Sequence, residues 1–308
     1  MYSNLKICVI GDGVHSKRIQ KLLIQKKCDF EVFKPKSKKN FKKENLKNLK
    51  EYNVIFISSP DDTHYHYIKE LYKFSYIFCE KPPCNNKENL KYLLKIKSKK
   101  IYYNYNYRFS KIFKLLQKKD KFKLGKLLYC NIIYGHALGL KKDYKNNWRS
   151  KKNKSPKGIL QVVSIHFIDL IHCLFKVKNI EIKLLSLSKF GNSFDNSIVK
   201  ITTKNNSLIH IYNSWTTQML NIKKFIFQNG SIEQDEDYLT IKGPALNLDK
   251  NNFTKYPNII KKFKFNQKKD SENSLNESIN FFLDHASRKK LFSRKKTKLS
   301  LISNKFVI

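Results

Sequence analysis

The sequence lacks any apolar run of the ~18 residues that a membrane-spanning helix needs. Its most apolar long segment, residues 159–175, is interrupted by polar side chains: Gln161, Ser164, His166, Asp169 and His172. The stretch before the first apolar run, Met1 to Lys6, is too short and too polar for a signal peptide. We therefore expect a cytoplasmic protein with no membrane partner.

Cysteine pairs at metal-binding spacing are also missing. The six cysteines are scattered and no two form a Cys-x-x-Cys pair: Cys8, Cys28, Cys79, Cys84, Cys130 and Cys173. Several lie inside apolar runs, as reduced thiols of a protein core do. We therefore expect neither a metal site nor disulfide bonds.

Arginine is scarce, although the chain is strongly basic. Five of the 63 basic residues are arginines, against 24 acidic residues, and the formal net charge is +39. One hypothesis is a polyanion-binding protein, but proteins that read nucleic acid usually concentrate charge and use arginine for bidentate contacts. Lysine here is spread over helices and loops alike, together with abundant Asn and Ile, which is typical of an AT-rich genome. We therefore favour solvated lysines and no nucleic-acid partner.

The length of 308 residues suits two domains. In the first hundred residues, strand-like and helix-like segments alternate. Strands are expected at residues 5–10, 30–33, 54–57, 76–79 and 101–105, and helices at 16–27, 43–50, 64–72 and 86–98. This alternation predicts a parallel, doubly wound sheet. Right-handed crossovers place the carboxyl ends of its strands on one edge, where ligands bind.

The pattern changes from about residue 120. The later segments predict a long strand at 126–136, a helix at 160–174, strands at 181–188, 197–203, 208–215, 223–228 and 238–241, and a helix at 274–285. The basic run 288–298 is interpreted as solvated surface. We expect an α/β N-terminal domain of Rossmann type, residues 1–120, and an α+β C-terminal domain, residues 121–308, with a large, mostly antiparallel open sheet.

A Gly-x-Gly-x-x-Ser motif follows the first strand directly and opens the first helix. Gly11 permits the tight turn, Gly13 lets the backbone approach a pyrophosphate, and Ser16 replaces the usual third Gly. The helix N-terminus then offers N–H donors and a positive dipole end to phosphates. The motif predicts a dinucleotide site that also includes the intervening residues Asp12, Val14 and His15.

Lys34 stands at the end of the second strand, where an acid usually holds the ribose 2′-OH of NAD. A cation at this position suits a 2′-phosphate, which favours NADP over NAD. The alternative is one more surface lysine in a lysine-rich chain.

Later segments carry a second set of motifs. Ser59-Pro60 and His64 form a Pro-containing turn and a His after the third strand, and residues 80–82 end a strand in Glu-Lys-Pro. Three further segments follow at residues 104–110 (NYNYRFS), 124–132 (LGKLLYCNI) and 158–171 (GILQVVSIHFIDLI). Together these motifs resemble those of the glucose–fructose oxidoreductase and inositol dehydrogenase (Gfo/Idh/MocA) family, and the resemblance covers nearly the whole chain. It implies hydride transfer between a nicotinamide and a carbinol carbon of a sugar, sugar acid or nucleotide-sugar.

The resemblance implies two catalytic residues, Lys81 and His166. The Lys81 ammonium would donate a hydrogen bond to the reacting oxygen and stabilise alkoxide charge. His166 would be the general acid or base, because an imidazole exchanges protons near neutral pH. The nicotinamide side would be lined by Ser58, Ser59, Pro60, His64, Glu80 and Lys81.

The helix that carries His166 departs from the family pattern. The family's Asp, four residues before the His, is Val162 here, and its Gly, two residues before the His, is Ser164. Asp169 lies one turn the other way, and we interpret it as structural. Loss of the carboxylate removes a partner that would orient the His ring. An alternative function is therefore a nucleotide-binding relative with weak or no catalysis, acting as a sensor or partner.

Four more residues are candidates for the substrate cleft, beside Lys81 and His166: Asn106, Arg108, Trp148 and Arg149. Arg149 suits an anionic group, such as a carboxylate or the diphosphate of a sugar nucleotide. The alternative for Arg149 is a surface arginine beside a packed tryptophan. The expected partners are a small sugar-type substrate and, by the family resemblance, further copies of the chain in a dimer or tetramer.

Overall fold

A computed structural model describes residues 2–34, 46–244 and 248–308, which divide into two compact units. The first comprises Met1–Asn106 and Leu275–Ile308, and the second comprises Tyr107–Ser274. This division differs from the expected one, 1–120 and 121–308, because the chain returns to the first unit at its C-terminal end. Apolar packing causes the return: Phe282 near the C-terminus lies 5.2 Å from Phe56 and 5.3 Å from Phe78, between ring centroids.

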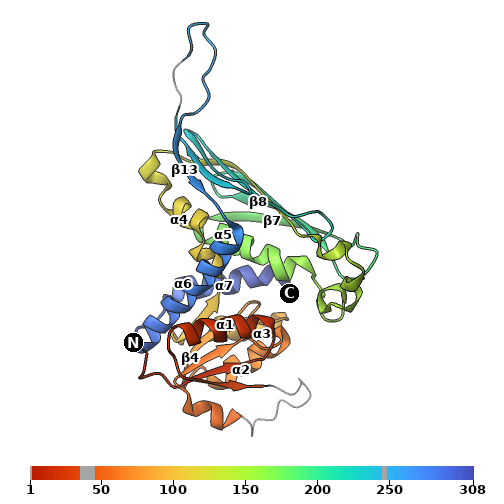
Figure 1. The fold of residues 1–308 in the computed structure, drawn as a ribbon, viewed down its shortest axis with the longest axis vertical. Coiled ribbons are helices and arrows are strands. Elements are labelled where there is room, and N and C mark those ends of the chain that lie inside the picture. The colour runs from red at the N-terminus through yellow and green to blue at the C-terminus, as the bar shows by residue number, and fades with distance from the viewer. Residues whose placement is uncertain (1, 35–45, 245–247) are drawn as a thin grey trace. The chain divides into compact units, whose positions relative to one another are not determined.

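The first unit contains a five-stranded sheet whose order is β2-β1-β3-β4-β5 and whose pairs are all parallel. Its strands are β1 (Ile7–Ile10), β2 (Phe30–Phe33), β3 (Val54–Ile57), β4 (Tyr76–Glu80) and β5 (Ile101–Asn104). Apart from β2, every strand residue is buried, as in a parallel sheet covered by helices on both faces. The predicted doubly wound parallel sheet is therefore confirmed (Figure 1).

Within its described residues, five helices contribute to this unit: α1 (Val14–Gln25), α2 (His64–Leu71), α3 (Lys87–Lys95), the C-terminal part of α6 (Gln267–Ser287), and α7 (Arg294–Asn304). Helix α7 packs against α3 and β5. It begins inside the basic run that was interpreted only as solvated surface, and its apolar residue Leu301 is buried. The helix expected at 43–50 is a short 3-10 turn, Asn48–Glu51, and residues 43–45 lie outside the described part.

The second unit contains an eight-stranded sheet ordered β13-β12-β11-β10-β6-β9-β8-β7. Only β6 and β9 pair in parallel among the pairs that the structure describes; the others are antiparallel. The strands are β6 (Leu127–Gly135), β7 (Val177–Leu185), β8 (Asn196–Thr203), β9 (Leu208–Ser214), β10 (Leu220–Phe227), β11 (Gly230–Gln234), β12 (Tyr238–Lys242) and β13 (Ile259–Lys264). The predicted large, mostly antiparallel sheet is confirmed, and β11 and β13 are additions to it.

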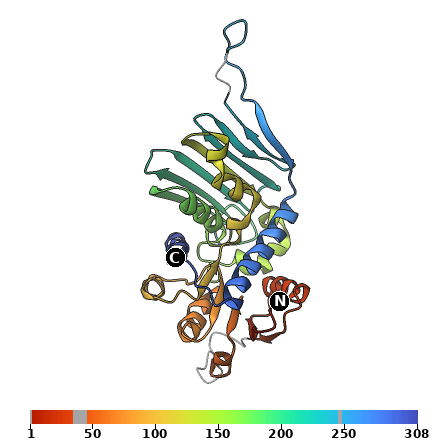
Figure 2. The same cartoon turned by 90° about the vertical axis from the view of Figure 1, so that its left-hand side faces the viewer.

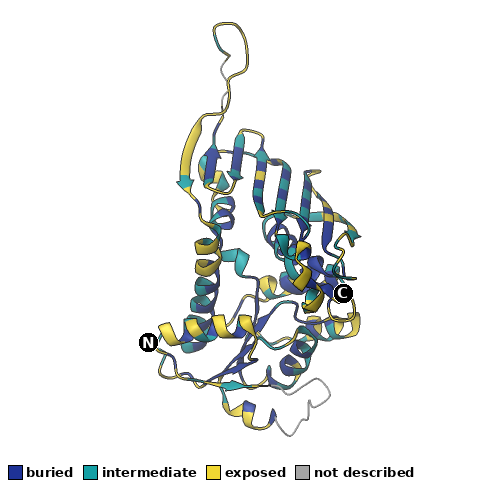
Figure 3. Ribbon diagram, turned by 45° about the vertical axis from the view of Figure 1, so that its right-hand side comes forward, coloured by how far each residue is buried: buried dark blue, intermediate teal, exposed yellow. Residues whose placement is uncertain are grey.

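Alternate residues of the central strands are buried, which gives this sheet one covered face (Figure 3). Two helices of the unit, α4 (Lys111–Gln117) and α5 (Ile165–Leu174), lie against the sheet (Figure 2). Phe167 of α5 contacts Tyr134 of β6, with ring centroids 6.2 Å apart. A π-helical turn, Leu160–Ser164, precedes α5, so the expected helix 160–174 is not regular over its whole length.

No helix in the described ranges combines the length and apolarity that crossing a membrane would require. No disulfide joins any of the six cysteines, and five of them are buried. Burial raises the pKa of the Cys8 and Cys84 thiols to about 12. These side chains therefore behave as apolar members of the core.

Candidate cofactor and catalytic sites

The turn after β1 is shaped by Gly11. Its φ is +126°, and a Cβ atom there would overlap the Ser58 carbonyl and lie 2.9 Å from the Ser59 nitrogen. Only glycine fits such a position. Gly13 faces open space, so nothing hinders the close approach of a ligand to its backbone. The buried Ser16 hydroxyl donates to the Gly11 carbonyl at 2.8 Å, which explains how serine serves in place of a third glycine.

The first turn of α1 offers backbone N–H groups to an anion. Gly13 is its N-cap, no side chain caps it, and the turn holds no acidic residue. The N–H groups at this end have no partner within the helix, and they form the positive end of the helix dipole. Asp12 stands just before the helix, and Lys34 Nζ lies 3.2 Å from its Oδ2. The structure thus places Lys34, the candidate for a 2′-phosphate, beside the phosphate turn.

The turn after β3 lies next to the phosphate turn, because the Ser58 nitrogen donates to the Ile10 carbonyl at 2.9 Å. The Thr63 hydroxyl donates to the Pro60 carbonyl at 2.7 Å, and the Ser59 hydroxyl lies 2.6 Å from Thr63 Oγ1. Since Thr63 uses its hydrogen on Pro60, Ser59 is the donor of the second bond. These bonds hold the segment Ser58–Pro60 along the carboxyl edge of the sheet.

His64 lies buried between two turns of the first unit. Its side chain is buried, with 2% of the residue exposed. Nδ1 lies 2.8 Å from the Pro82 carbonyl oxygen, and Nε2 lies 2.9 Å from the Ser59 carbonyl oxygen. Both ring nitrogens therefore face backbone, and His64 joins the turn after β3 to the turn after β4. His64 therefore positions these turns, and its expected contact with a cofactor stays a prediction.

Glu80, at the end of β4, is buried among hydrogen-bond donors. His15 Nε2 lies 2.8 Å from Glu80 Oε1, and Asn104 Nδ2 donates to the same oxygen at 2.6 Å. Burial by itself raises the pKa of Glu80, but the charge and hydrogen bond of His15, the Asn104 amide and the Lys81 charge lower it below its usual value. Asn104 was not predicted, because it gains this role only when β5 pairs with β4.

Lys81 follows Glu80 and is half-buried. It interacts electrostatically with Glu80 and with Asp61, a residue of the 3-10 turn Asp61–Thr63. Burial raises the pKa of Asp61, while the charges of His64 and Lys81 oppose the rise. The Lys81 ammonium thus belongs to a charged cluster at the carboxyl ends of β3 and β4.

In the second unit, His166 lies on α5 and is half-buried. Its ring stacks on the Tyr107 ring, with centroids 4.6 Å apart and planes 22° apart. Burial raises the pKa of Tyr107, so the phenol stays protonated beside the imidazole. Tyr107 was not predicted, although it lies inside the NYNYRFS segment.

Two residues close to His166 in the sequence, Val162 and Asp169, make packing and ion-pair contacts within the second unit. Val162 packs against an apolar cluster of Tyr144, Ile159 and Trp215. Asp169 accepts two bonds from Arg108, from Nε at 2.7 Å and from Nη2 at 2.6 Å. The structural role expected of Asp169 agrees with this pair. Arg108 anchors its own turn to α5, and its expected place in the substrate cleft stays a prediction.

Trp148 and Arg149 lie together in a short turn of the second unit. The Arg149 guanidinium lies 4.5 Å from the centroid of the Trp148 ring, which is partly exposed. This cation–π contact orients Arg149 but leaves its substrate role a prediction. Asn106, the last residue of the first unit, is half-buried. Because Lys81 belongs to the first unit and His166 to the second, their meeting at one substrate also stays a prediction.

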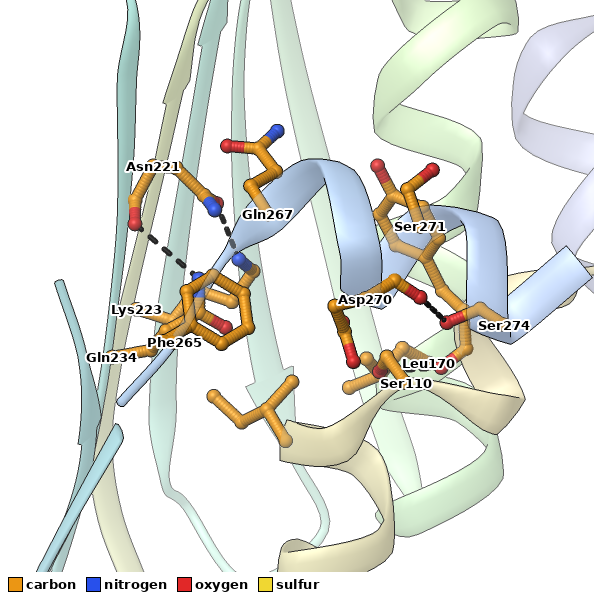
Figure 4. A pocket seen from close by; sticks show the side chains of 12 residues that line it. Ser110, Leu170, Asn221, Lys223, Gln234, Phe265, Gln267, Asp270, Ser271 and Ser274 are labelled. Atoms are coloured by element: carbon orange, nitrogen blue, oxygen red, sulfur yellow. Dashed lines mark hydrogen bonds between the residues drawn. The ribbon is translucent and has the colours of Figure 1, made fainter. Parts of the chain in front are cut away.

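A small cavity of about 30 Å³ inside the second unit holds charged residues that the sequence did not mark (Figure 4). Lys223 of β10 and Asp270 of α6 line it from different elements, and Tyr107 is a further lining residue. Lys223 Nζ donates to Asn221 Oδ1 at 2.5 Å. Burial lowers the pKa of Lys223 to about 7 and raises that of Asp270, so both groups tend toward their neutral forms.

The model of the GFO/IDH/MocA C-terminal domain matches residues 114–233. No curated protein sequence matches the chain. The domain match lies within the second unit and agrees there with the family resemblance indicated by the sequence motifs.

Solved structures of the same fold cover almost the whole chain. An oxidoreductase from Thermotoga maritima is 15% identical, with a TM-score of 0.75, and the match covers 98% of this chain and 94% of that one. Levoglucosan dehydrogenase in complex with NADH and levoglucosan is 14% identical, with a TM-score of 0.75 and coverage of 97% and 95%. A myo-inositol dehydrogenase from Corynebacterium glutamicum is 16% identical, with a TM-score of 0.71 and coverage of 98% and 94%. At these identities the likeness shows the fold alone.

Proposed function

We propose that this chain, which carries the C-terminal domain of the Gfo/Idh/MocA family, is an oxidoreductase that uses a nicotinamide dinucleotide. Its reaction is hydride transfer between the nicotinamide and a carbinol carbon of a sugar, sugar acid or nucleotide-sugar. One observation carries the proposal: the glycine turn leads into an α1 N-terminus without a side-chain cap, at the carboxyl edge of a parallel sheet. The sugar dehydrogenases among the structures of the same fold support the substrate class.

The residues of the phosphate turn fit a dinucleotide. The open space at Gly13 admits a diphosphate, and the N–H groups of the first turn of α1 donate to it. Val14 is largely exposed there and Asp12 is paired with Lys34, so neither obstructs an anion. The turns ending in Pro60 and Lys81 lie farther along the same edge and would hold the nicotinamide half.

A bound nicotinamide ring supplies the hydride donor or acceptor. Lys81 would donate a hydrogen bond to the substrate oxygen, and its charge would stabilise that oxygen as the proton leaves. His166 would take up or return the hydroxyl proton, with Tyr107 holding the plane of its ring. Trp148, Arg149 and Asn106 are the remaining candidates for substrate contacts.

NADP is the favoured cofactor in this proposal, because Lys34 lies at the end of β2, where a 2′-phosphate is recognised. Its ion pair with Asp12 would then be exchanged for one with the phosphate. The proposal also includes the homo-oligomer and the cytoplasmic location that the sequence predicts.

Purified full-length protein tests the proposal. We expect NADPH or NADH to bind, and absorbance at ~340 nm, the nicotinamide band, to change with at least one member of a panel of sugars, sugar acids and nucleotide-sugars. His166→Asn should lower turnover by roughly a hundredfold or more while dinucleotide affinity is kept. His172→Asn, on the same helix, is the matched control and should keep both. Absence of dinucleotide binding by the wild-type protein would refute the proposal.

The second candidate function is a dinucleotide-binding protein without turnover. It is favoured by Val162, whose packing in an apolar cluster leaves His166 without the carboxylate expected one turn before it. This candidate predicts tight NADPH or NADH binding, no turnover with any member of the panel, and no change in affinity when sugars are added. Turnover that His166→Asn removes would exclude it.

A further inference from the structure

Residues 248–264 of the second unit, here called the arm, are exposed over nearly their whole length. The arm contains the far end of the connection between β12 and β13, and β13 itself. Figures 1 and 2 show that this end of the connection extends beyond the ends of the sheet strands. Every residue from 250 to 262 is exposed, as Figure 3 also shows, so this part of the chain has no core of its own.

Local hydrogen bonds close the end of the arm into a turn. The Asp249 nitrogen donates to the Phe253 carbonyl at 2.9 Å, and Leu248 pairs with Thr254 in an antiparallel bridge. Asp249 Oδ1 accepts from the backbone nitrogens of Asn251 at 2.8 Å and of Phe253 at 2.9 Å. Such Asx-type bonds stabilise a turn without any packing partner. The backbone of this end therefore has a defined conformation, although its side chains face solvent.

Large apolar side chains gather on the arm. Phe253 is 70% exposed and Tyr256 is 93% exposed. Single exposed apolar residues are normal on a protein surface, but a cluster of them marks a contact with a protein or a membrane. Within the described residues, the arm holds five of the sixteen large apolar side chains that are exposed: Leu248, Phe253, Tyr256, Ile259 and Ile260.

The arm is also basic. Its one acidic residue is Asp249, whose carboxylate is already engaged by backbone donors of the turn. Lys262 lies 3.9 Å from the centroid of the Tyr238 ring. In the part of the chain that the structure describes, no lysine of the arm forms an ion pair with a carboxylate. These lysines are all exposed, and they are Lys250, Lys255, Lys261, Lys262 and Lys264.

Charge and composition together select the partner. A second copy of this chain paired along β13 would bring like charges together, and lysines on an edge strand oppose such pairing. Nucleic-acid sites use arginine and aromatic stacking, but the arm has no arginine, and Leu248, Ile259 and Ile260 cannot stack on bases. Exposed aliphatic and aromatic side chains next to unpaired lysines are typical of segments that lie in the interface of an anionic bilayer.

We propose that the arm binds the surface of an anionic bilayer, with Phe253 and Tyr256 in the headgroup region and the lysines on lipid phosphates. The lack of a membrane-spanning helix led us to expect no membrane partner. We depart from that expectation here, because a peripheral contact needs no such helix. This inference goes beyond the proposed function and does not depend on it, since no residue of the arm is a candidate for the cofactor or substrate site.

The first test measures co-sedimentation of the full-length protein with lipid vesicles. We expect binding to phosphatidylcholine vesicles that contain phosphatidylserine, and little binding to pure phosphatidylcholine. Phe253→Ser combined with Tyr256→Ser should weaken binding by roughly tenfold or more, because two large apolar side chains no longer leave water. Lys250→Gln combined with Lys255→Gln should also weaken it by roughly tenfold or more, since each lysine near an anionic surface contributes a few-fold.

Matched controls lie at the opposite edge of the same sheet, on and next to β7 and β8. Lys178→Gln combined with Lys204→Gln removes two exposed lysines, and Leu187→Ser removes an apolar side chain that is 59% exposed. Each control should change binding by less than about twofold, since salt screens exposed charges that lie away from the contact. Equal losses for the two lysine pairs, with full binding by Phe253→Ser combined with Tyr256→Ser, would overturn the assignment to the arm and leave attraction by overall charge.

The second test asks whether the arm enters the lipid. The added tryptophan of Phe253→Trp should shift its emission to shorter wavelength on phosphatidylserine vesicles and be quenched by brominated lipid, after subtraction of the wild-type signal. Leu187→Trp is the control and should show neither effect. Binding of duplex DNA or polyglutamate as tight as that of vesicles, together with an unshifted emission of Phe253→Trp on vesicles, would replace the bilayer by an acidic macromolecule and overturn the inference.

Discussion

In the first unit, Glu80 lies buried among donors that converge on its carboxylate, and its pKa stays low. In the second unit, Lys223 is also buried, but its ammonium donates to the neutral oxygen of Asn221, and burial outweighs the nearby charge of Asp270. Its pKa falls to about 7. Of these two buried ionisable groups, Glu80 is kept charged and Lys223 is close to losing its charge.

The difference lies in the partners and not in the depth of burial. A buried charge persists where hydrogen bonds and an opposite charge replace the lost water, and otherwise the group tends to its neutral form. The second unit shows both cases, because Arg108 and Asp169 form a bidentate pair while Lys223 and Asp270 do not share a hydrogen bond in the described structure. Glu80 therefore keeps its charge near neutral pH, whereas the charge of Lys223 in its cavity depends on solution pH.

The largest expected effect comes from breaking the buried pair of the second unit. Arg108→Met leaves the Asp169 carboxylate, 1% exposed, without its bidentate partner. We expect a loss of about 3–5 kcal/mol in the free energy of unfolding, measured by urea denaturation. The control is Lys200→Met, which removes a partly exposed partner of Glu181 at 3.6 Å and should cost less than about 1 kcal/mol. Equal losses in the two variants would show that the buried Arg108–Asp169 pair contributes no more to stability than the partly exposed Lys200–Glu181 pair.

The next largest effect is expected at Lys223, where a substitution should raise the free energy of unfolding instead of lowering it. Its folded pKa is below its unfolded value, so between about pH 7 and pH 10 the unfolded chain binds more protons than the folded one. Wild-type stability should therefore rise with pH across this range, by at most roughly 1.4 kcal/mol per pH unit. Lys223→Met removes the buried amine, so it should stabilise the protein by up to a few kcal/mol at pH 7, and the gain should shrink toward pH 10.

Lys224→Met is the matched control for this measurement. Lys224 is the next residue on β10, its side chain is about half exposed, and it pairs with Glu233 at 3.6 Å. Its replacement should change the free energy of unfolding by less than about 1 kcal/mol at every pH. A Lys223→Met difference that stays constant from pH 6 to pH 10 would show that Lys223 does not titrate in this range.

A smaller effect is expected at Glu80. Because its folded pKa is depressed, its contribution to stability is present above the unfolded value and is lost as the pH falls through the folded one. Glu80→Gln should destabilise the protein by about 1–3 kcal/mol at pH 7, the range for hydrogen bonds to a charged group, and the difference should close in acid. Glu51→Gln, which removes an exposed partner of Lys6, should give a flat and much smaller difference. A Glu80→Gln penalty independent of pH would assign Glu80 a packing role only.

The sequence pattern was sufficient for the class of both sheets and for the glycine turn after β1, because these depend on local signals. Strands β3 and β2 were both predicted to the residue. Strand β3 shows the signal most clearly, since a buried parallel strand is a short apolar run between turn signals. The turn at Gly11 was predicted because a glycine between a strand and a helix marks a backbone position that a side chain would not fit. Strand β13 was missed, since its lysines and exposed residues give no alternation.

The partners of the site residues could not be predicted in the same way. Asn104 meets Glu80 through pairing of neighbouring strands, and Ser278 meets Asn104 across 174 positions of sequence. Arg108 was assigned to substrate because its bidentate partner, Asp169, is 61 residues away. Such contacts follow from the tertiary fold and leave no periodic signal. For the same reason the sequence could not show that both ring nitrogens of His64 face backbone carbonyls.

The smallest expected effect tests the remaining charge at the phosphate turn. Lys34 and Asp12 form an exposed pair at 3.2 Å, with side chains 69% and 43% exposed, so the pair itself contributes little to stability. If Lys34 recognises a 2′-phosphate, Lys34→Ala should raise the Kd for NADPH a few-fold and leave that for NADH nearly unchanged, measured by nicotinamide fluorescence. Lys21→Ala, on the exposed side of α1, should change neither. Equal weakening for both dinucleotides would mean that Lys34 acts on the shared diphosphate through Asp12, because removing the lysine exposes any bound phosphate to the Asp12 carboxylate.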